Sequence, residues 1–225
     1  MTINSPPWKL SPSNFHFGFD KCKCCYYLET KHNIKQPKDF PGIFSKFDSM
    51  HKNFSENMHT SEISAEIPPG VFDNELSGKI LISETIDFGN DITCYIYGKG
   101  DAFIRLDDGT HAVVDFKTTK ISPDKIDSYK TQLNAYCYAL EHNTYGKPRR
   151  SPITKLGIIC FEPENMTRNN EGGRFAINHS VQFFEIEKNE EEFLNYIRGI
   201  AECLSGEMPE PNPNCKFCNY RELEV

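Results

Sequence analysis

The stretch 98–136 combines two apolar runs, a tight-turn sequence between them and a helical repeat directly afterwards. This order restricts the possible folds more than any other part of the chain. The runs 103–106 and 112–117 have the apolar and β-branched content of strands. Between them lies Asp107-Asp108-Gly109, which is typical of a hairpin turn because glycine accepts the positive φ that such turns need. The pattern predicts an antiparallel hairpin that leads into a helix.

Two acids and a lysine lie at the ends of these predicted strands. Side chains alternate between the two faces of a strand, so Asp115 and Lys117 share a face, and the hairpin brings Asp101 near Asp115. Two carboxylates and the backbone carbonyl of Phe116 are hard oxygen ligands that suit Mg²⁺ or Mn²⁺. Such an ion polarises a phosphate and generates hydroxide, while Lys117 would orient the attacking water or offset charge on the phosphate.

The alternative is a solvated charge pair at a strand edge. Against it stands the position of Asp115 directly after an apolar run, where a buried unpaired charge would be costly.

Apolar residues at helical spacing predict a helix over 124–142, and Ser122-Pro123-Asp124 has the composition of its N-terminus. Gln132 and Tyr136 are four residues apart and therefore share a face of this helix. In one interpretation Tyr136 is a core residue and Gln132 is merely interfacial. In the other, Gln132 hydrogen-bonds the DNA backbone or a metal-bound water, and Tyr136 contacts phosphate or stacks on a base.

In combination these residues resemble the RecB-type nuclease domain of the PD-(D/E)xK superfamily, as found in CRISPR-associated and phage exonucleases. The resemblance rests on Gly98-Lys99-Gly100-Asp101, Asp115-Phe116-Lys117-Thr118-Thr119 and Tyr129-Lys130-Thr131-Gln132-Leu133-Asn134-Ala135-Tyr136. It implies a mixed sheet flanked by helices, with a restriction-endonuclease-like core, and Mg²⁺- or Mn²⁺-dependent cleavage of DNA. By position it implies metal binding by Asp101 and Asp115, a catalytic role for Lys117, and a QxxxY pair formed by Gln132 and Tyr136.

The resemblance also implies further ligands and partners. In this family an acid or histidine from an upstream helix often completes the site, and Asp48 is the candidate here, with His51 as the alternative. The competing interpretation of Asp48 is an acid on a helix surface. The implied partners are DNA and other DNA-processing or CRISPR adaptation proteins.

Nine cysteines are present, and four of them form two Cys-x-x-Cys pairs near the chain ends, Cys22/Cys25 and Cys215/Cys218. These pairs predict a four-thiolate site for zinc or an iron–sulfur cluster, which would join the N- and C-terminal segments. Cluster-bearing relatives have one N-terminal and three C-terminal cysteines, and this chain departs from that pattern. Cys24 is a possible substitute ligand, and a set of free thiols is the alternative.

The other cysteines lie in apolar patterns and are expected to be small core residues. They are Cys94, Cys137, Cys160 and Cys203. An odd cysteine count without a secretory signal predicts a reducing, cytoplasmic compartment.

The composition predicts one domain over 1–225, since 38% of its residues are hydrophobic and no apolar run reaches membrane-spanning length. The net charge of −7 argues against DNA binding through a broad basic face and fits a local site where metal ions supply positive charge. The clearest basic cluster is Lys147, Arg149 and Arg150, which would hold DNA or lie in a solvated loop.

The predicted layout is α/β, with a core over about 78–187, an N-terminal helical part over 11–60 and a C-terminal helix and cysteine segment over 190–225. The expected helices are 11–29, 40–60, 124–142 and 190–205. The expected strands are 78–85, 91–97, the hairpin 101–117, 156–161 and 181–186, with a polar link over 61–70 and a polar loop over 163–179.

Three functions compete at this point. The first is a metal-dependent DNA nuclease, and by its resemblance an exonuclease, since Asp101, Asp115, Lys117, Gln132 and Tyr136 are all present. The second is a catalytically silent nucleic-acid-binding or adaptor module of a larger complex. The third is a structural metal protein whose carboxylates are incidental.

Overall fold

A computed structural model describes residues 4–36, 42–120, 123–168 and 173–222. Its largest sheet has five strands in the order β2-β6-β7-β8-β9. Their bounds are Gly70–Phe72 (β2), Ala102–Leu106 (β6), His111–Lys117 (β7), Ile153–Arg168 (β8) and Phe175–Ile186 (β9). β7 and β8 are parallel and the other neighbouring pairs are antiparallel, so the predicted mixed α/β sheet is confirmed.

A second, smaller sheet contains β1 (Trp8–Leu10), β5 (Thr93–Gly98) and β3 (Leu81–Ile82), with β4 (Ile86–Asp87) also paired to β5. The strand expected over 78–85 therefore shrinks to two residues, and the pairing of the N-terminal β1 with β5 was not predicted.

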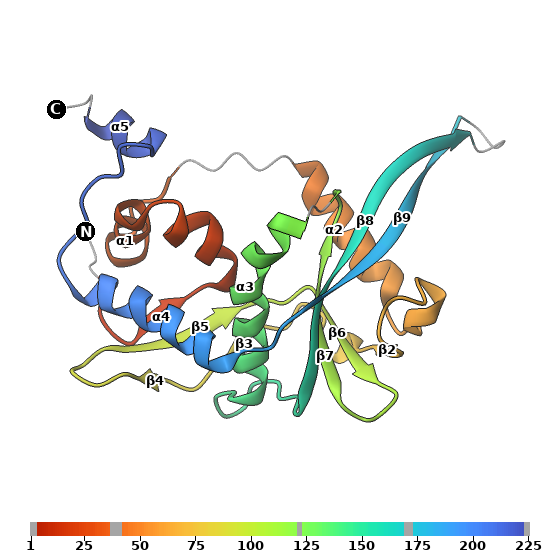
Figure 1. The fold of residues 1–225 in the computed structure, drawn as a ribbon, viewed down its shortest axis with the longest axis horizontal. Helices are drawn as coiled ribbons and strands as arrows, with labels where there is room; N and C mark the ends of the chain where they lie inside the picture. The colour runs from red at the N-terminus through yellow and green to blue at the C-terminus, as the bar shows by residue number, and fades with distance from the viewer. Residues whose placement is uncertain (1–3, 37–41, 121–122, 169–172, 223–225) are drawn as a thin grey trace.

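Helix α3 (Pro123–Glu141) connects the parallel strands β7 and β8, as a crossover between parallel strands requires. It lies across the front of the structure in Figure 1, with α4 (Glu190–Ser205) and α1 (Lys23–His32) beside it and α2 (Gly42–Ser55) on the far side of β7. Ser122, expected to start α3, lies outside the described residues.

The alternation of β7 divides the core in two. Val113 packs against α3, α4 and α1 in the larger cluster, whereas Val114 and Phe116 face a second cluster that includes Phe72 and Phe161. Asp115 shares the face of Val113 and is directed to the α3 side. The sheet thus presents the end of β7 to the helix that follows it.

The N-terminal helical part is less regular than expected. In place of one helix over 11–29, a 3₁₀ turn (η1, Pro12–Asn14) is followed by a π-helical segment (η2, Phe15–Asp20) and then by α1. Cys22 has an extended backbone, and its sulfur accepts a hydrogen bond from the Cys25 N–H. Cys22 is therefore the N-cap of α1 and separates this helix from the preceding π-helical segment. α2 ends at Ser55, before Asn57 adopts a positive φ, and residues 40–41 of the expected helix lie outside the described residues.

The prediction of a polar loop over 163–179 is wrong for its described residues. β8 continues to Arg168, and β9 begins at Phe175, so the two form a long antiparallel hairpin that extends beyond the body of the protein (Figure 1). Its outer part is exposed on both faces, so the sequence lacks the alternation of a half-buried strand. The register shifts between Pro163 and Asn165, which fits a proline that cannot donate to the ladder.

Other short elements were also not predicted. The link expected over 61–70 begins with a 3₁₀ turn, η3 (Thr60–Glu62), and ends at β2, and another turn, η4 (Asn74–Leu76), follows β2. α5 (Lys216–Glu222) lies in the C-terminal cysteine segment. Among the described helices, none has the length and apolar character needed to cross a membrane.

Gly70 allows β2 to approach β6 closely, and Gly70→Ala is expected to lower the free energy of unfolding by about 1–3 kcal/mol. A Cβ at this position would lie 2.5 Å from the carbonyl oxygen of Arg105 and 2.8 Å from Cα of Leu106. Both are backbone atoms and cannot move without displacing the strand. Chemical denaturation measures the change. The control is Gly199→Ala in α4, where a Cβ meets no atom within 4 Å, so its stability should rise by up to about 1 kcal/mol. Equal stability of the two variants would contradict the packing argument.

Candidate active site

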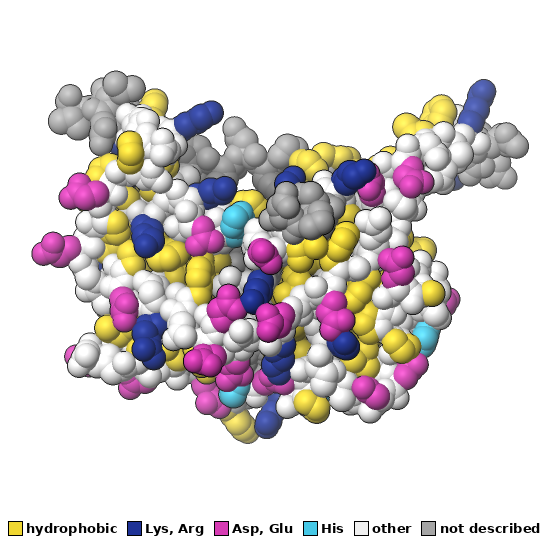
Figure 2. Space-filling model, in the orientation of Figure 1, with side chains coloured by type: hydrophobic (Ala, Val, Ile, Leu, Met, Phe, Trp, Pro, Cys, Tyr) yellow, Lys and Arg dark blue, Asp and Glu magenta, His cyan; other side chains and the backbone are white. Residues whose placement is uncertain are grey.

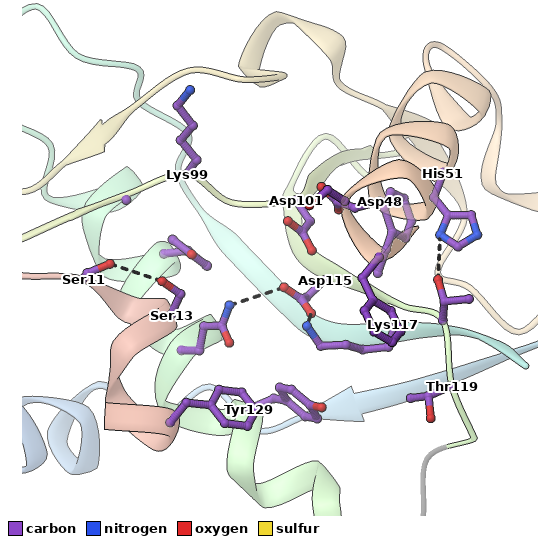
Figure 3. A pocket seen from close by; sticks show the side chains of 18 residues that line it. Ser11, Ser13, Asp48, His51, Lys99, Asp101, Asp115, Lys117, Thr119 and Tyr129 are labelled. Atoms are coloured by element: carbon purple, nitrogen blue, oxygen red, sulfur yellow. Dashed lines mark hydrogen bonds and ion pairs between the residues drawn. The ribbon is translucent and has the colours of Figure 1, made fainter. Parts of the chain in front are cut away.

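The hairpin register places Asp101 and Asp115 opposite each other. β6 and β7 pair antiparallel, with Ala102 opposite Val114. Asp101, directly before β6, therefore lies opposite Asp115 on β7. The turn contains Gly109 at φ +85°, as expected for its position. In Figure 3 the two carboxylates point into the same space. The predicted proximity of the two acids is therefore confirmed.

Asp115 is almost completely buried, at 2% exposure. Its burial, together with the negative charge of Asp101, raises the pKa of its carboxyl to about 8. Its Oδ1 accepts a hydrogen bond from Gln132 Nε2 at 3.4 Å. Its Oδ2 forms an ion pair with the Lys117 ammonium at 2.5 Å. This carboxylate therefore needs more positive charge than its surroundings supply.

Lys117 reaches Asp115 from two residues along the same strand and the same face. Burial alone would lower the pKa of this ammonium, but the charge of Asp115 and the hydrogen bond to it outweigh burial, and the pKa is raised. The ammonium also lies 4.9 Å from the centre of the Tyr129 ring. Lys117 is thus held in its charged form at the cavity wall.

Lys52 of α2 is a site residue that sequence reasoning missed. Its Nζ lies 2.8 Å from Asp101 Oδ1 and 2.9 Å from Asp48 Oδ2. Burial alone would raise the pKa of Asp101, but hydrogen bonding with Asp115 and the charge of Lys52 outweigh it, and the pKa is lowered. The signal in the sequence was the spacing of four between Asp48 and Lys52, which puts both on one helical face.

The two candidates for an upstream ligand both line the cavity, but they have different surroundings. Asp48 is linked to Asp101 through Lys52. His51 stacks on Phe161 with ring centres 4.0 Å apart, and its Nδ1 lies 3.5 Å from Thr118 Oγ1. Burial lowers the pKa of His51. Asp48 therefore shares a lysine partner with the carboxylate pair, whereas His51 contacts Phe161 and Thr118.

The helical pair on α3 is divided between the site and the core. Gln132 contacts Asp115, so it is more than an interfacial residue. Tyr136 is 4% exposed and belongs to the larger core cluster, yet it also borders the cavity. Burial, followed by the charges of Asp101 and Asp115, raises the pKa of its hydroxyl. Tyr136 is thus a core residue that also borders the cavity, and its contact with a phosphate or a base stays a prediction.

Apart from Lys52, these side chains line one open cavity of about 590 Å³. Figure 3 shows α2 on one side with Asp48 and His51, the η1 segment on the other with Ser11 and Ser13, and the carboxylates between them. The remaining polar lining includes Lys99, Thr118 and Thr119, which the sequence did not single out as site residues.

The donor set fits a divalent cation. Asp101 and Asp115 offer facing carboxylates, and Phe116, whose carbonyl was the third expected ligand, also lines the cavity. The burial of Asp115 and the mutual repulsion of the two acids are features that a bound cation would relieve. Hard oxygen donors of this kind suit Mg²⁺ or Mn²⁺.

The four predicted cysteines meet at a second site. The sulfurs of Cys22, Cys25, Cys215 and Cys218 all lie within 4.8 Å of one another. Cys22 Sγ and Cys25 Sγ are each 3.5 Å from Cys218 Sγ, and Cys25 Sγ is 3.7 Å from Cys215 Sγ. The two chain ends are therefore brought together as expected, and the group could hold a metal or cluster.

Two further residues border this four-cysteine group. Cys24 is buried but does not belong to the group. Arg221 Nη2 lies 3.4 Å from the sulfurs of Cys25 and Cys218. Burial alone would raise the pKa of the Cys218 thiol. A backbone hydrogen bond at Asn212 and side-chain hydrogen bonds with Cys22, Cys25 and Arg221 outweigh burial and lower this pKa to about 7. Of the cysteines expected in the core, Cys94, Cys137 and Cys160 are buried and Cys203 is half-buried.

The predicted basic cluster divides into paired and unpaired side chains. Arg150 is engaged by Asp73 at 2.8 Å and by Glu75 at 2.8 Å, so its charge is already balanced. On the face shown in Figure 2, acidic and basic side chains are interspersed, and the described residues there form no broad basic surface.

Comparison with known proteins bears on the fold and the family. A family model described as the PD-(D/E)XK nuclease superfamily matches residues 73–223. The crystal structure of SSO0001 aligns with a TM-score of 0.54, covering 98% of this chain and 87% of that chain at 12% sequence identity. At that identity the likeness shows a shared fold. No curated protein matches the chain.

Proposed function

The chain belongs to the PD-(D/E)XK nuclease superfamily, and from this premise we propose that it is a Mg²⁺- or Mn²⁺-dependent DNA nuclease, an exonuclease of the RecB type. The observation that carries the proposal is the environment of Asp115. A nearly buried carboxylate faces a second carboxylate, and the Lys117 ammonium is its ion-pair partner. Two acids held this close in a buried position repel each other, and a bound cation would offset that repulsion.

In this proposal Asp101, Asp115 and the Phe116 carbonyl hold the ion, with Asp48 as an additional candidate ligand. When bound, the ion polarises the phosphate and lowers the pKa of water. Gln132 fixes the orientation of Asp115 through its hydrogen bond to Oδ1. Lys117, charged and anchored on Asp115, offers its ammonium to the attacking water or to the developing charge on the phosphate.

The proposal is tested by incubating end-labelled single- and double-stranded DNA with the protein and Mg²⁺, Mn²⁺ or a chelator. We expect products with either metal and none with the chelator. The end label reveals whether cleavage starts from a terminus. Intact substrate under all metal conditions, with folded protein, would contradict the nuclease assignment.

The alternative is a catalytically silent nucleic-acid-binding or adaptor module of a larger DNA-processing complex. One observation favours it, since each carboxylate already has a lysine partner, Lys52 on Asp101 and Lys117 on Asp115. Binding of DNA that is independent of metal, without products, would support this function. The RecB-type resemblance supports DNA-processing or CRISPR adaptation proteins as the partners to test.

The position of Lys52 leads to a prediction about metal affinity. Its ammonium competes with a cation for Asp101, so Lys52→Met is expected to lower the Mn²⁺ concentration for half-maximal activity about fivefold, the equivalent of about 1 kcal/mol. The measurement is activity against Mn²⁺ concentration. Lys46→Met is the matched control because Lys46 is exposed on the same helix, whereas Lys52 contacts Asp101. A higher Mn²⁺ requirement would instead show that Lys52 positions Asp101 for the metal.

A further inference from the structure

An exposed aromatic ring borders the cavity of the carboxylates. Phe17 lies in the irregular η2 segment and is 63% exposed, and its ring makes an edge contact with His16 at a ring separation of 5.0 Å. Phe44 of α2 lines the same cavity and is 47% exposed. Large aromatic side chains at the mouth of an active-site cavity are unfavourably hydrated, and their flat faces suit stacking with unpaired bases.

Three lysines lie along a second cavity, which shares one lining residue with the first. Lys99 lines both cavities, and the second, of about 640 Å³, also contains Lys79 and Lys147. None of the three forms an ion pair with a residue in the described part of the chain. In Figure 3 the Lys99 side chain points away from the carboxylates. Its positive charge is therefore available to a ligand outside the catalytic centre.

One strand can offer both a phosphate to the carboxylates and an unpaired base to an aromatic ring at the mouth of the same cavity. Phe17 lines this cavity together with Asp101 and Asp115, so a phosphodiester at the carboxylates has neighbouring bases beside the ring. The arrangement therefore suits a strand whose bases near the scissile phosphate are unpaired. Such bases are available to the ring of Phe17.

We propose that Phe17 and the lysines Lys99, Lys147 and Lys79 form the substrate track of this site. Phe17 stacks on a base next to the scissile phosphate, and the lysines bind successive phosphates of the same strand beyond Lys99. This inference rests on the proposed nuclease function. It accounts for how an acidic protein holds a polyanion, since three lysines line a cavity that shares Lys99 with the cavity of the carboxylates.

The aromatic part is tested by steady-state cleavage of end-labelled oligothymidylate, which offers only unpaired bases. Phe17→Ala is expected to raise KM about fivefold or more with kcat nearly unchanged, because stacking contributes binding. Phe17→Tyr should retain the wild-type KM. Phe175→Ala is the control, since Phe175 is similarly exposed at 61% on β9 and does not border the cavity.

The lysine part is tested by the salt dependence of oligothymidylate binding, measured by fluorescence anisotropy in a Lys117→Ala background that leaves the probe intact. Each phosphate contact contributes about 0.7 to the slope of log K against log salt for single strands. Lys99→Gln with Lys147→Gln should make the slope shallower by about 1.4. Lys155→Gln is the control, because Lys155 pairs with Glu185 and lines neither cavity.

The outcomes separate the track from the nuclease function. If DNA is cleaved but Phe17→Ala behaves like Phe175→Ala, or if the salt slope is unchanged, the track is wrong and the nuclease function stands. If no substrate is cleaved, the nuclease function fails, and the anisotropy alone decides the track. A slope change confined to the Lys99/Lys147 variant then supports it, and equal slopes overturn it.

Discussion

Lys117→Ala is expected to reduce the rate of metal-dependent DNA cleavage by about 10²–10³-fold or more, the loss typical of a charge-stabilising group in an active site. The ammonium lies 2.5 Å from Asp115 and faces the cavity, so it is the cation positioned to act on the reacting groups. The measurement is the single-turnover rate at saturating protein and Mn²⁺. This condition separates the chemical step from substrate binding.

Lys120→Ala is the matched control. Lys120 follows closely on the same chain segment, but its side chain is 81% exposed and pairs at 3.5 Å with Glu162. Its removal should leave the rate within about twofold, since exposed ion pairs contribute little. A Lys117→Ala protein that is folded and cleaves at the wild-type rate would remove Lys117 from the mechanism.

Removing Lys117 also affects the fold, and the assay must account for it. Breaking a buried ion pair costs about 3–5 kcal/mol when the remaining charge stays ionised. Asp115 already has a pKa raised to about 8, mainly by burial, so it is protonated easily once Lys117 is gone. The variant should therefore remain folded at neutral pH, and circular dichroism verifies this before its rate is compared.

Local patterns in the sequence were sufficient to predict the centre of the site. The turn at 107–109 fixes the register of β6 and β7, and the period of two along β7 then directs Asp115 and Lys117 to one face. The period of the following helix places Gln132 toward that face. The hairpin register, the strand period and the helix period each depend on residues close in sequence, so local patterns determine which side chains face the site.

Long-range packing explains what the sequence did not predict. Lys52 joins the site only because α2 crosses the open end of the sheet, and no local pattern specifies that crossing. The outer hairpin of β8 and β9 is stabilised by backbone pairing between polar strands, which leaves no apolar alternation to detect. β1 likewise pairs with a strand more than 80 positions away, Trp8 lying opposite Cys94.

The four-cysteine group extends the same argument to the chain ends. Cys22 and Cys218 are separated by 196 positions and are brought to 3.5 Å between their sulfurs. Four thiolates at about 2.3 Å around one tetrahedral ion lie roughly 3.8 Å apart, close to the spacing of these sulfurs. A cluster that carries each thiolate on a different iron needs a wider spacing. The group could hold a metal or a cluster, and its sulfur spacing is that of a single zinc ion.

Cys218→Ser is expected to abolish metal binding at this group and to lower the free energy of unfolding by about 3–5 kcal/mol, because a cross-link closing so long a loop is lost. For a chain of this size the midpoint of thermal unfolding should fall by about 10 °C or more. Elemental analysis and thermal denaturation measure the two effects. Cys203→Ser is the control, since Cys203 is half-buried and lies outside the group.

The metal content of anaerobically purified wild type decides between the occupants. Colourless protein with one equivalent of zinc fits the close sulfur spacing, whereas brown protein containing iron would mean that the segments around Cys22 and Cys215 separate to admit a cluster. If Cys218→Ser and Cys203→Ser unfold at the wild-type temperature, the cysteines are free thiols. The chain ends are then held by packing alone, chiefly by α1 against α4, where Lys31 reaches the carbonyl of Leu204.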